Sequence, residues 1–204
     1  MTGENDALAD VSRGTLDRLE TYAALLKKWN PAINLVAKST LDDLWDRHIV
    51  DSAQIFGLIP DFQHWADLGS GGGFPGMVVA ILAAERQPQA KVTLVESDLR
   101  KATFLRTVAR ETGIDADVIS QRIEQVPPLG ADVVSARALA PLDRLLAFAE
   151  RHLTPQGTAL FLKGQNFQTE LDTALASWRF DVQKLSSQTE STAVILKIGG
   201  LARV

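Results

Sequence analysis

The sequence contains no cysteine and only three histidines. Without cysteine the chain can form no disulfide, thiolate nucleophile or cysteine-ligated zinc site. The histidines are scattered and lack the spacing of metal ligands, so we expect no bound metal: they are His48, His64 and His152. The lack of cysteine also fits a reducing compartment.

Long apolar runs and a strong charge of one sign are also missing. No run reaches the roughly 20 residues that a membrane-spanning helix needs, and the opening MTGENDALAD is too polar and acidic for a signal sequence. We therefore expect a cytoplasmic protein with no membrane partner. The formal net charge is −4, from 21 Lys and Arg against 25 Asp and Glu, so any nucleic-acid site must be a local basic surface.

The chain has 204 residues, of which 46% are hydrophobic, enough for one globular domain but short for two. Apolar residues recur at helical spacing over residues 15–30, where Pro31 stops the pattern, and again over residues 41–56. No linker follows. We predict a helical extension over residues 1–60, packed on one α/β domain over residues 61–204, and we expect a monomer.

From residue 64 onward, short apolar runs alternate with helical stretches, which is typical of βαβ units and a mostly parallel sheet. The expected strands are HWADL, KVTLVE, ADVIS, ADVVSA and TALFLK, and the expected helices span residues 76–84, 100–112, 142–152 and 167–178. The final runs, FDVQKL and TAVILKI, are joined by SSQTES, which is too short for a parallel crossover. They should pair antiparallel, and ligands should bind at the carboxyl ends of the parallel strands.

A glycine-rich loop, DLGSGGGFPG, connects the first of these strands to the next helix. Gly69 and Gly71 let the backbone turn tightly and approach a ligand. The loop lacks the Lys followed by Ser or Thr of a phosphate-binding P-loop, and Phe74 replaces the third glycine of a dinucleotide fingerprint, which weakens pyrophosphate binding without excluding it. Asp67 suits a cationic ligand such as S-adenosylmethionine; its alternative role is a turn or helix cap.

Further residues could line the same ligand site. Glu96 ends the next strand, 23 residues after Gly73, where a carboxylate can bind ribose hydroxyls or simply precede a helix as a solvated acid. Ile123 could pack on adenine and Glu124 could read its edge, although Ile123 also fits a core position. Arg137, after the fourth strand, should avoid a sulfonium cation. Its partners would be the ligand carboxylate, an RNA phosphate or guanine O6, or a surface acid.

Several segments together resemble the RsmG family, also called GidB: WNPAINLVA, RHIVDSA, DLGSGGGFPG, VESDLRKATFL, SARALAPL and LFLKGQ. The resemblance runs over nearly the whole chain. It implies a Rossmann-like class I methyltransferase fold with seven strands, the last antiparallel, and S-adenosylmethionine as cofactor. The implied reaction is methyl transfer to N7 of one guanosine in the decoding-region loop of bacterial 16S rRNA, free or in the small ribosomal subunit. The implied cofactor contacts are Gly69, Phe74, Ile123, Glu124 and Arg137.

Guanine N7 has an in-plane lone pair and no hydrogen, so this reaction needs no general base and can depend on positioning, with Arg137 as the candidate residue. Arg100, Lys101 and Lys163 are candidates for RNA binding, although an ordinary surface charge is the alternative for each. His48, within reach of Asp51, is expected to be structural. Two other functions stay open: a methyltransferase acting on a small molecule, and a non-catalytic nucleotide- or RNA-binding module.

Overall fold

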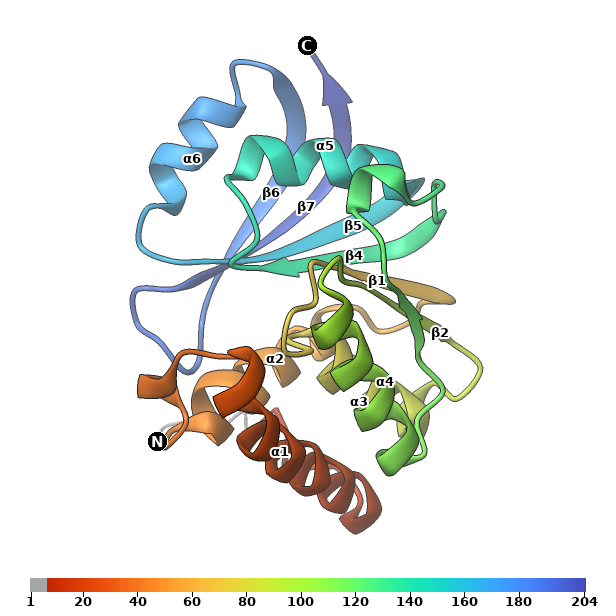
Figure 1. The fold of residues 1–204 in the computed structure, drawn as a ribbon. Helices are drawn as coiled ribbons and strands as arrows, with labels where there is room; N and C mark the ends of the chain where they lie inside the picture. Colours follow the sequence, from red (N-terminus) through yellow and green to blue (C-terminus); the bar gives the residue numbers. More distant parts are fainter. Residues whose placement is uncertain (1–6) are drawn as a thin grey trace.

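The structure is a computed structural model that describes residues 7–204. One sheet has the strand order β3-β2-β1-β4-β5-β7-β6, with helices on both faces (Figure 1). Strands β1 to β5 are parallel, and β7 is antiparallel to both β5 and β6, which confirms the expected α/β sheet with a reversed last strand. The strands are β1 (His64–Leu68), β2 (Lys91–Val95), β3 (Asp117–Ile119), β4 (Ala131–Arg137), β5 (Leu153–Lys163), β6 (Trp178–Ser186) and β7 (Val194–Arg203).

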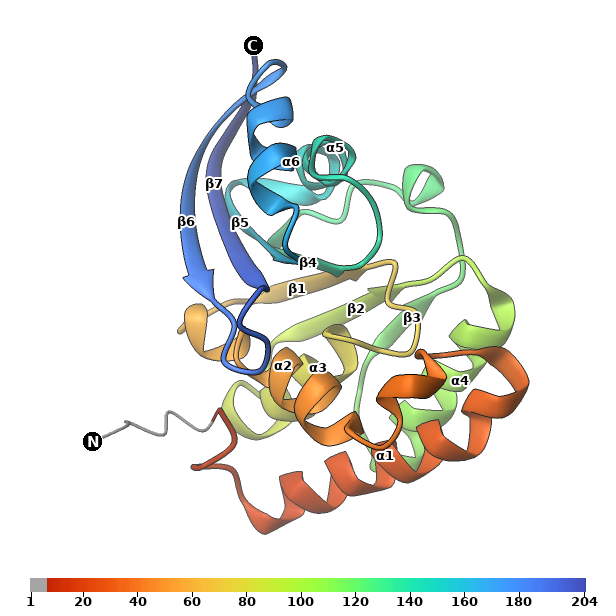
Figure 2. The ribbon, with the colours of Figure 1, turned by 90° about the vertical axis from the view of Figure 1, so that its left-hand side faces the viewer.

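The helices form layers on the two faces of the sheet (Figures 1 and 2). One face carries α5 (Leu142–His152) and α6 (Phe167–Ala174), and the other carries α2 (Asp51–Ala53), α3 (Gly76–Arg86) and α4 (Leu99–Thr112). Helix α1 (Arg13–Ile33) packs across α3 and α4 as an outer layer. Shorter helical turns are η1 (Lys38–Thr40), η2 (Trp45–Val50), η3 (Phe56–Leu58) and η4 (Ile123–Gln125).

Alternate residues of the central strands enter two hydrophobic cores, as the pleat of a strand requires. Trp65 and Leu160 belong to one core, and Ala66 and Phe161 belong to the other. The first core also contains Leu19 of α1. The helical extension and the sheet therefore share one core.

The extension also touches the loops at the carboxyl ends of the strands. The hydroxyl of Tyr22 in α1 donates a hydrogen bond to the carbonyl of Gly72 (2.5 Å). Asp51 in α2 forms an ion pair with Arg137 at the end of β4 (3.1 Å). Both contacts fasten the extension to the edge of the sheet where ligands bind in such folds.

The expected end of the first helix at Pro31 is wrong, because α1 continues to Ile33. Pro31 has no backbone N–H, so the helix loses one hydrogen bond in its last turn but continues for two more residues. Asn34 caps the helix, and its φ of 49° turns the chain away. Asn30 secures the exit, since its Oδ1 accepts hydrogen bonds from the N–H groups of Leu35 (2.7 Å) and Val36 (2.9 Å).

Two other helix boundaries differ from expectation. Residues 41–56 do not form one α-helix; the segment has a π-helical turn at η2, then α2, then a 3-10 turn at η3. Such π turns often occur at functional sites, and this one carries His48. The expected helix over residues 167–178 ends at Ala174, because Trp178 starts β6 with its indole buried and its Nε1 bonded to Asp143 (2.8 Å).

Within the described residues, no helix is long and apolar enough to cross a membrane. The same residues contain no group of three or more His, Asp or Glu side chains that could hold a metal ion.

Candidate functional site

The glycine-rich loop lies between β1 and α3, at the carboxyl ends of β1 and β2. Gly69 has a φ of 67°, a conformation that residues with a Cβ rarely adopt. The N–H groups of Gly69 and Ser70 donate to the carbonyl of Val95 in β2 (2.8 and 3.0 Å), which fastens the loop to the sheet. Gly69, Gly71 and Phe74 line a cavity of about 400 Å³, called here the glycine-loop cavity.

Glu96 follows β2, is only 9% exposed and also lines the glycine-loop cavity. Its Oε2 accepts a hydrogen bond from the N–H of Gly71 (2.8 Å), and its Oε1 accepts one from the N–H of Asp98 (2.7 Å). Each carboxylate oxygen has two lone pairs. Glu96 therefore holds the loop in shape and keeps unused acceptor capacity beside the cavity.

Ile123 and Glu124 lie on η4 and line the same cavity, as does Lys101. Ile123 is buried, and its carbonyl oxygen lies 3.2 Å from Nε2 of His152. Glu124 forms an ion pair with Arg144 (2.6 Å), and hydrogen bonding to that guanidinium lowers the pKa of Glu124. These side chains give the cavity an apolar surface beside a carboxylate.

Asp67 does not line the glycine-loop cavity. The side chain is fully buried at the end of β1, and its Oδ1 accepts a hydrogen bond from Ser135 (2.7 Å). Oδ2 has no hydrogen-bond partner among the described residues. Burial raises the pKa of Asp67 to about 6. Helix α3 covers this carboxylate at Gly76, where an added Cβ would lie 2.5 Å from the Cβ of Asp67. The direct ligand contact expected of Asp67 is therefore replaced by a buried charge beneath the loop.

Arg137 ends β4, and its side chain is 17% exposed. Its Nη1 donates to Oδ2 of Asp51 (3.1 Å) and to the carbonyl of Arg47 (3.3 Å), and its Nη2 donates to Nδ1 of His48 (2.8 Å). The guanidinium lies over the ring of Phe74, 5.0 Å from its centroid. An acidic partner was one of the alternatives for Arg137 in the sequence analysis. The structure shows such a partner, Asp51, which belongs to the helical extension.

His48, expected to be a structural residue within reach of Asp51, forms its side-chain hydrogen bonds with Arg137 and Thr40. Because arginine can only donate, Nδ1 of His48 accepts, and Nε2 carries the proton toward the hydroxyl of Thr40 (2.8 Å). Burial, together with the positive charge of Arg137, lowers the pKa of His48 to about 4, so the ring is neutral at pH 7. Its ring stacks on Phe74 with centroids 5.0 Å apart.

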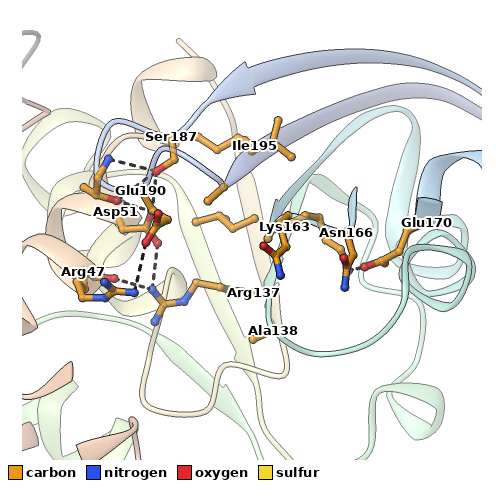
Figure 3. Close-up of a pocket in the computed structure, with 16 residues that line it drawn as sticks. Arg47, Asp51, Arg137, Ala138, Lys163, Asn166, Glu170, Ser187, Glu190 and Ile195 are labelled. Carbon is orange, nitrogen blue, oxygen red and sulfur yellow. Dashed lines mark hydrogen bonds and ion pairs between the residues drawn. The ribbon is translucent and has the colours of Figure 1, made fainter. Parts of the chain in front are cut away.

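A second cavity, of about 390 Å³, lies between the ends of β4 and β5, the start of β7 and the β6–β7 loop (Figure 3). Arg137 and Ala138 line both this second cavity and the glycine-loop cavity. The two cavities therefore meet at the carboxyl end of β4. The other side chains that line the second cavity include Asp51, Leu162, Lys163, Asn166, Thr189, Glu190 and Ile195.

The basic residues expected to bind RNA have different surroundings. Lys163 is only 10% exposed, forms an ion pair with Glu170 (2.6 Å) and donates to the carbonyl of Ala140 (3.1 Å), so it connects two loops and supports the structural alternative. Arg100 is exposed and pairs with Asp98 (2.9 Å).

Asp51 is the residue of this site that the sequence interpretation did not assign. It lies in the RHIVDSA segment together with His48. These two polar residues in an otherwise apolar helical stripe were the only sign in the sequence that the segment contributes to a site.

The parallel sheet, the reversed β7, the glycine loop after β1 and the acid after β2 together define the class I methyltransferase fold. Solved structures agree. A methyltransferase from Geobacter sulfurreducens superposes with a TM-score of 0.62 and 13% identity, covering 94% of this chain and 90% of that chain. A ribosomal protein L11 methylase from Lactobacillus delbrueckii subsp. bulgaricus gives a TM-score of 0.57 at 20% identity, covering 75% and 78%. At such identities the likeness shows the fold alone.

Sequence comparison identifies the family. The family model for GidB, described as rRNA small subunit methyltransferase G, matches residues 15–196. Curated relatives named ribosomal RNA small subunit methyltransferase G include one from a Ruegeria species, 55% identical over 99% of this chain and 98% of the relative. Another, from Ruegeria pomeroyi, is 55% identical over 96% of each chain. The chain belongs to the rRNA small subunit methyltransferase G family, which confirms the resemblance seen in its motifs.

Proposed function

We propose that this protein transfers the methyl group of S-adenosylmethionine to N7 of one guanosine in the 16S rRNA of the small ribosomal subunit. The names of its relatives support the rRNA substrate. The observation that carries the proposal is the meeting of two cavities at Arg137, one lined by the glycine loop and one lined by the ends of β4 and β5 and the β6–β7 loop. When bound, S-adenosylmethionine supplies an electrophilic methyl group on a sulfonium ion.

The residues of the glycine-loop cavity fit this cofactor. A volume of about 400 Å³ lies in the range of small-molecule sites. Glu96 has unused lone pairs for ribose hydroxyls, and Ile123 offers an apolar surface for adenine beside the carboxylate of Glu124. Gly69 and Gly71 bring backbone to the cavity with no side chain in the way. We propose these residues, together with Phe74 and Arg137, as the cofactor contacts.

The charges around the cavity favour a cation over a pyrophosphate. Asp67, with a pKa of about 6, is mostly ionised at pH 7 and places a negative charge beneath the loop. Glu96 adds a second carboxylate at the cavity wall. The positive charge of Arg137 is offset by Asp51 at 3.1 Å, which weakens its repulsion of a sulfonium.

The chain's own residues would act by positioning. Guanine N7 carries a lone pair and no proton, so no side chain needs to remove one. His48, neutral and bonded to Arg137 through Nδ1, is committed to holding that side chain. The second cavity, at about 390 Å³, has room for a base that has left its stack. Holding acceptor and donor atoms in line can by itself supply several kcal/mol of the rate enhancement, on the order of 7 or more.

We further propose that residues 61–204 form the catalytic domain, that residues 1–60 form an extension packed on it, and that the protein acts as a monomer in the bacterial cytoplasm. Arg100, which is exposed, and Lys101, at the cavity wall, are the proposed RNA contacts.

The test uses purified protein, labelled S-adenosylmethionine and small ribosomal subunits from cells that lack this modification, with free 16S rRNA in parallel. Chemical cleavage specific for N7-methylguanosine should place the label at one guanosine. Glu150→Gln, which breaks an exposed ion pair with Arg203 at the end of β7 away from both cavities (2.8 Å), should act like the unaltered protein. Failure to label either RNA would contradict the proposal, and label appearing in a small molecule would favour the alternative methyltransferase.

A further inference from the structure

Arg137 has hydrogen-bonding capacity that the protein does not use. A guanidinium carries five N–H groups. Two donate from Nη1, to Asp51 and to the carbonyl of Arg47, and one donates from Nη2 to His48. Within residues 7–204, the N–H of Nε and the second N–H of Nη2 have no hydrogen-bond partner. These two N–H groups remain able to donate to a bound acceptor.

Arg137 lies at the junction of the two cavities, toward which the acceptor base must point its N7. It lines both cavities, so a base in the second cavity that faces the glycine-loop cavity with N7 also brings its 6-position to this wall. In guanine the 6-position is a carbonyl, a hydrogen-bond acceptor, whereas in adenine it is an amino group, a donor. An arginine N–H can pair only with the carbonyl.

We propose that Arg137 selects guanine by donating from an unpaired N–H group to O6 of the acceptor base, and that Asp51 is the positioning residue that holds Arg137 for this task. The inference rests on the function proposed above and specifies how its acceptor is recognised.

Asp51 joins two walls of the second cavity with one carboxylate (Figure 3). Its Oδ2 accepts from Arg137 at the end of β4. Its Oδ1 accepts from Nε2 of Gln54 (2.8 Å) and from the hydroxyls of Thr189 (3.0 Å) and Ser187 (3.3 Å) in the β6–β7 loop. The Asp51 side chain is only 14% exposed, so these bonds are largely shielded from water. The carboxylate thus fixes both the guanidinium and the loop that faces it.

The charge of Asp51 has a second consequence during the reaction. The N7 lone pair forms the new bond to the methyl carbon, the carbon–sulfur bond breaks and its electron pair returns to sulfur. Positive charge therefore moves from sulfur onto the purine, beside the guanidinium. Asp51 offsets the charge of Arg137 as the purine becomes cationic. Removing that carboxylate charge should lower kcat about tenfold, because the uncompensated guanidinium then repels the positive charge that develops on the purine.

The first experiment changes the base. Small subunits are reconstituted with 16S rRNA that carries guanosine, inosine or 2-aminopurine at the position where the cleavage assay finds the methyl group. Inosine keeps N7 and O6, and 2-aminopurine keeps N7 but has only hydrogen at the 6-position. Single-turnover methylation is measured at saturating S-adenosylmethionine, and equilibrium binding of each subunit is measured with S-adenosylhomocysteine present. Since N7 reactivity differs among the bases, the ratio of guanosine to 2-aminopurine is compared between enzymes.

For the unaltered protein we expect inosine to bind and react nearly like guanosine, and 2-aminopurine to do both about tenfold more weakly. Arg137→Met should bring the guanosine to 2-aminopurine ratio close to one in binding, and should lower the ratio of methylation rates about tenfold from that of the unaltered protein. The inference is overturned if Arg137→Met slows all three bases equally, or if 2-aminopurine matches guanosine with the unaltered protein. N7 methylation of natural subunits by the unaltered protein would in either case leave the proposed function intact.

The second experiment tests Asp51. Asp51→Asn should lower kcat and shrink the guanosine to 2-aminopurine ratio by larger factors than it raises the Kd of S-adenosylhomocysteine, since Arg137 also lines the cofactor cavity. Asp51→Glu should restore part of both. Glu150→Gln, at a residue that lines neither cavity, leaves the Asp51–Arg137 pair intact, so it should keep the ratio. An Asp51→Asn protein that melts normally and retains the full ratio would refute the positioning role.

Discussion

Replacing the buried Asp67 with Asn should change how the stability of the protein depends on pH. Burial raises the pKa of Asp67 from 3.8 to about 6, so the folded protein holds this proton more tightly than the unfolded chain. A raised pKa stabilises the fold below about pH 4, and that contribution is lost as the pH rises through 6. The shift of roughly two units corresponds to about 3 kcal/mol in the free energy of unfolding.

The assay compares urea unfolding of the unaltered protein and Asp67→Asn between pH 4 and pH 7.5. The free energy of unfolding of the unaltered protein, relative to the variant, should fall by about 2.5 kcal/mol across this range and level off above pH 7. An Asn amide placed where Oδ2 has no partner shifts the whole curve but not its slope. Asp61→Asn, at an exposed aspartate, should show no such slope. If the difference in the free energy of unfolding between the unaltered protein and Asp67→Asn did not change with pH, the raised pKa of Asp67 would be refuted.

Three further outcomes follow from the structure. Glu96→Gln should raise the Kd of S-adenosylhomocysteine about 10- to 100-fold in calorimetry, since a charged acceptor is lost; a change under twofold would remove Glu96 from the site. Gly76→Ala should destabilise the fold by about 1–3 kcal/mol in urea unfolding, because its Cβ would collide with Asp67 and Leu94, whereas Gly57→Ala, with open space around it, should not. Lys101→Gln should reduce the salt dependence of subunit binding by a slope of about 1, and an unchanged slope would exclude Lys101 from the RNA interface.

Much of the fold could be predicted because its signals are local. The alternation of short apolar runs with helical stretches predicted the parallel strands, and the short SSQTES link predicted the reversed β7. The boundary at Pro31 was wrong because local capping sets the end of the helix, and the boundary at Trp178 was wrong because of a tertiary contact. Asn30 and Asn34 form the true end of α1, and the Trp178 indole is buried against α5, where it bonds to Asp143.

The site could be predicted only where chain order determines position. Glu96 and the glycine loop follow adjacent parallel strands, so they had to meet at one edge of the sheet. The burial of Asp67 could not be predicted, because it depends on how closely α3 packs at Gly76. The pair between Asp51 and Arg137 joins residues 86 positions apart and depends on the docking of the extension, which no local pattern specifies.

A crystal structure with S-adenosylhomocysteine bound tests the cofactor assignment most directly. The ribose hydroxyls should lie on Glu96, the adenine against Ile123, and the sulfur beside Arg137 and Ala138, where the two cavities meet. A ligand bound elsewhere, or a glycine-loop cavity filled by its own side chains with Glu96 turned to bulk water, would contradict this account.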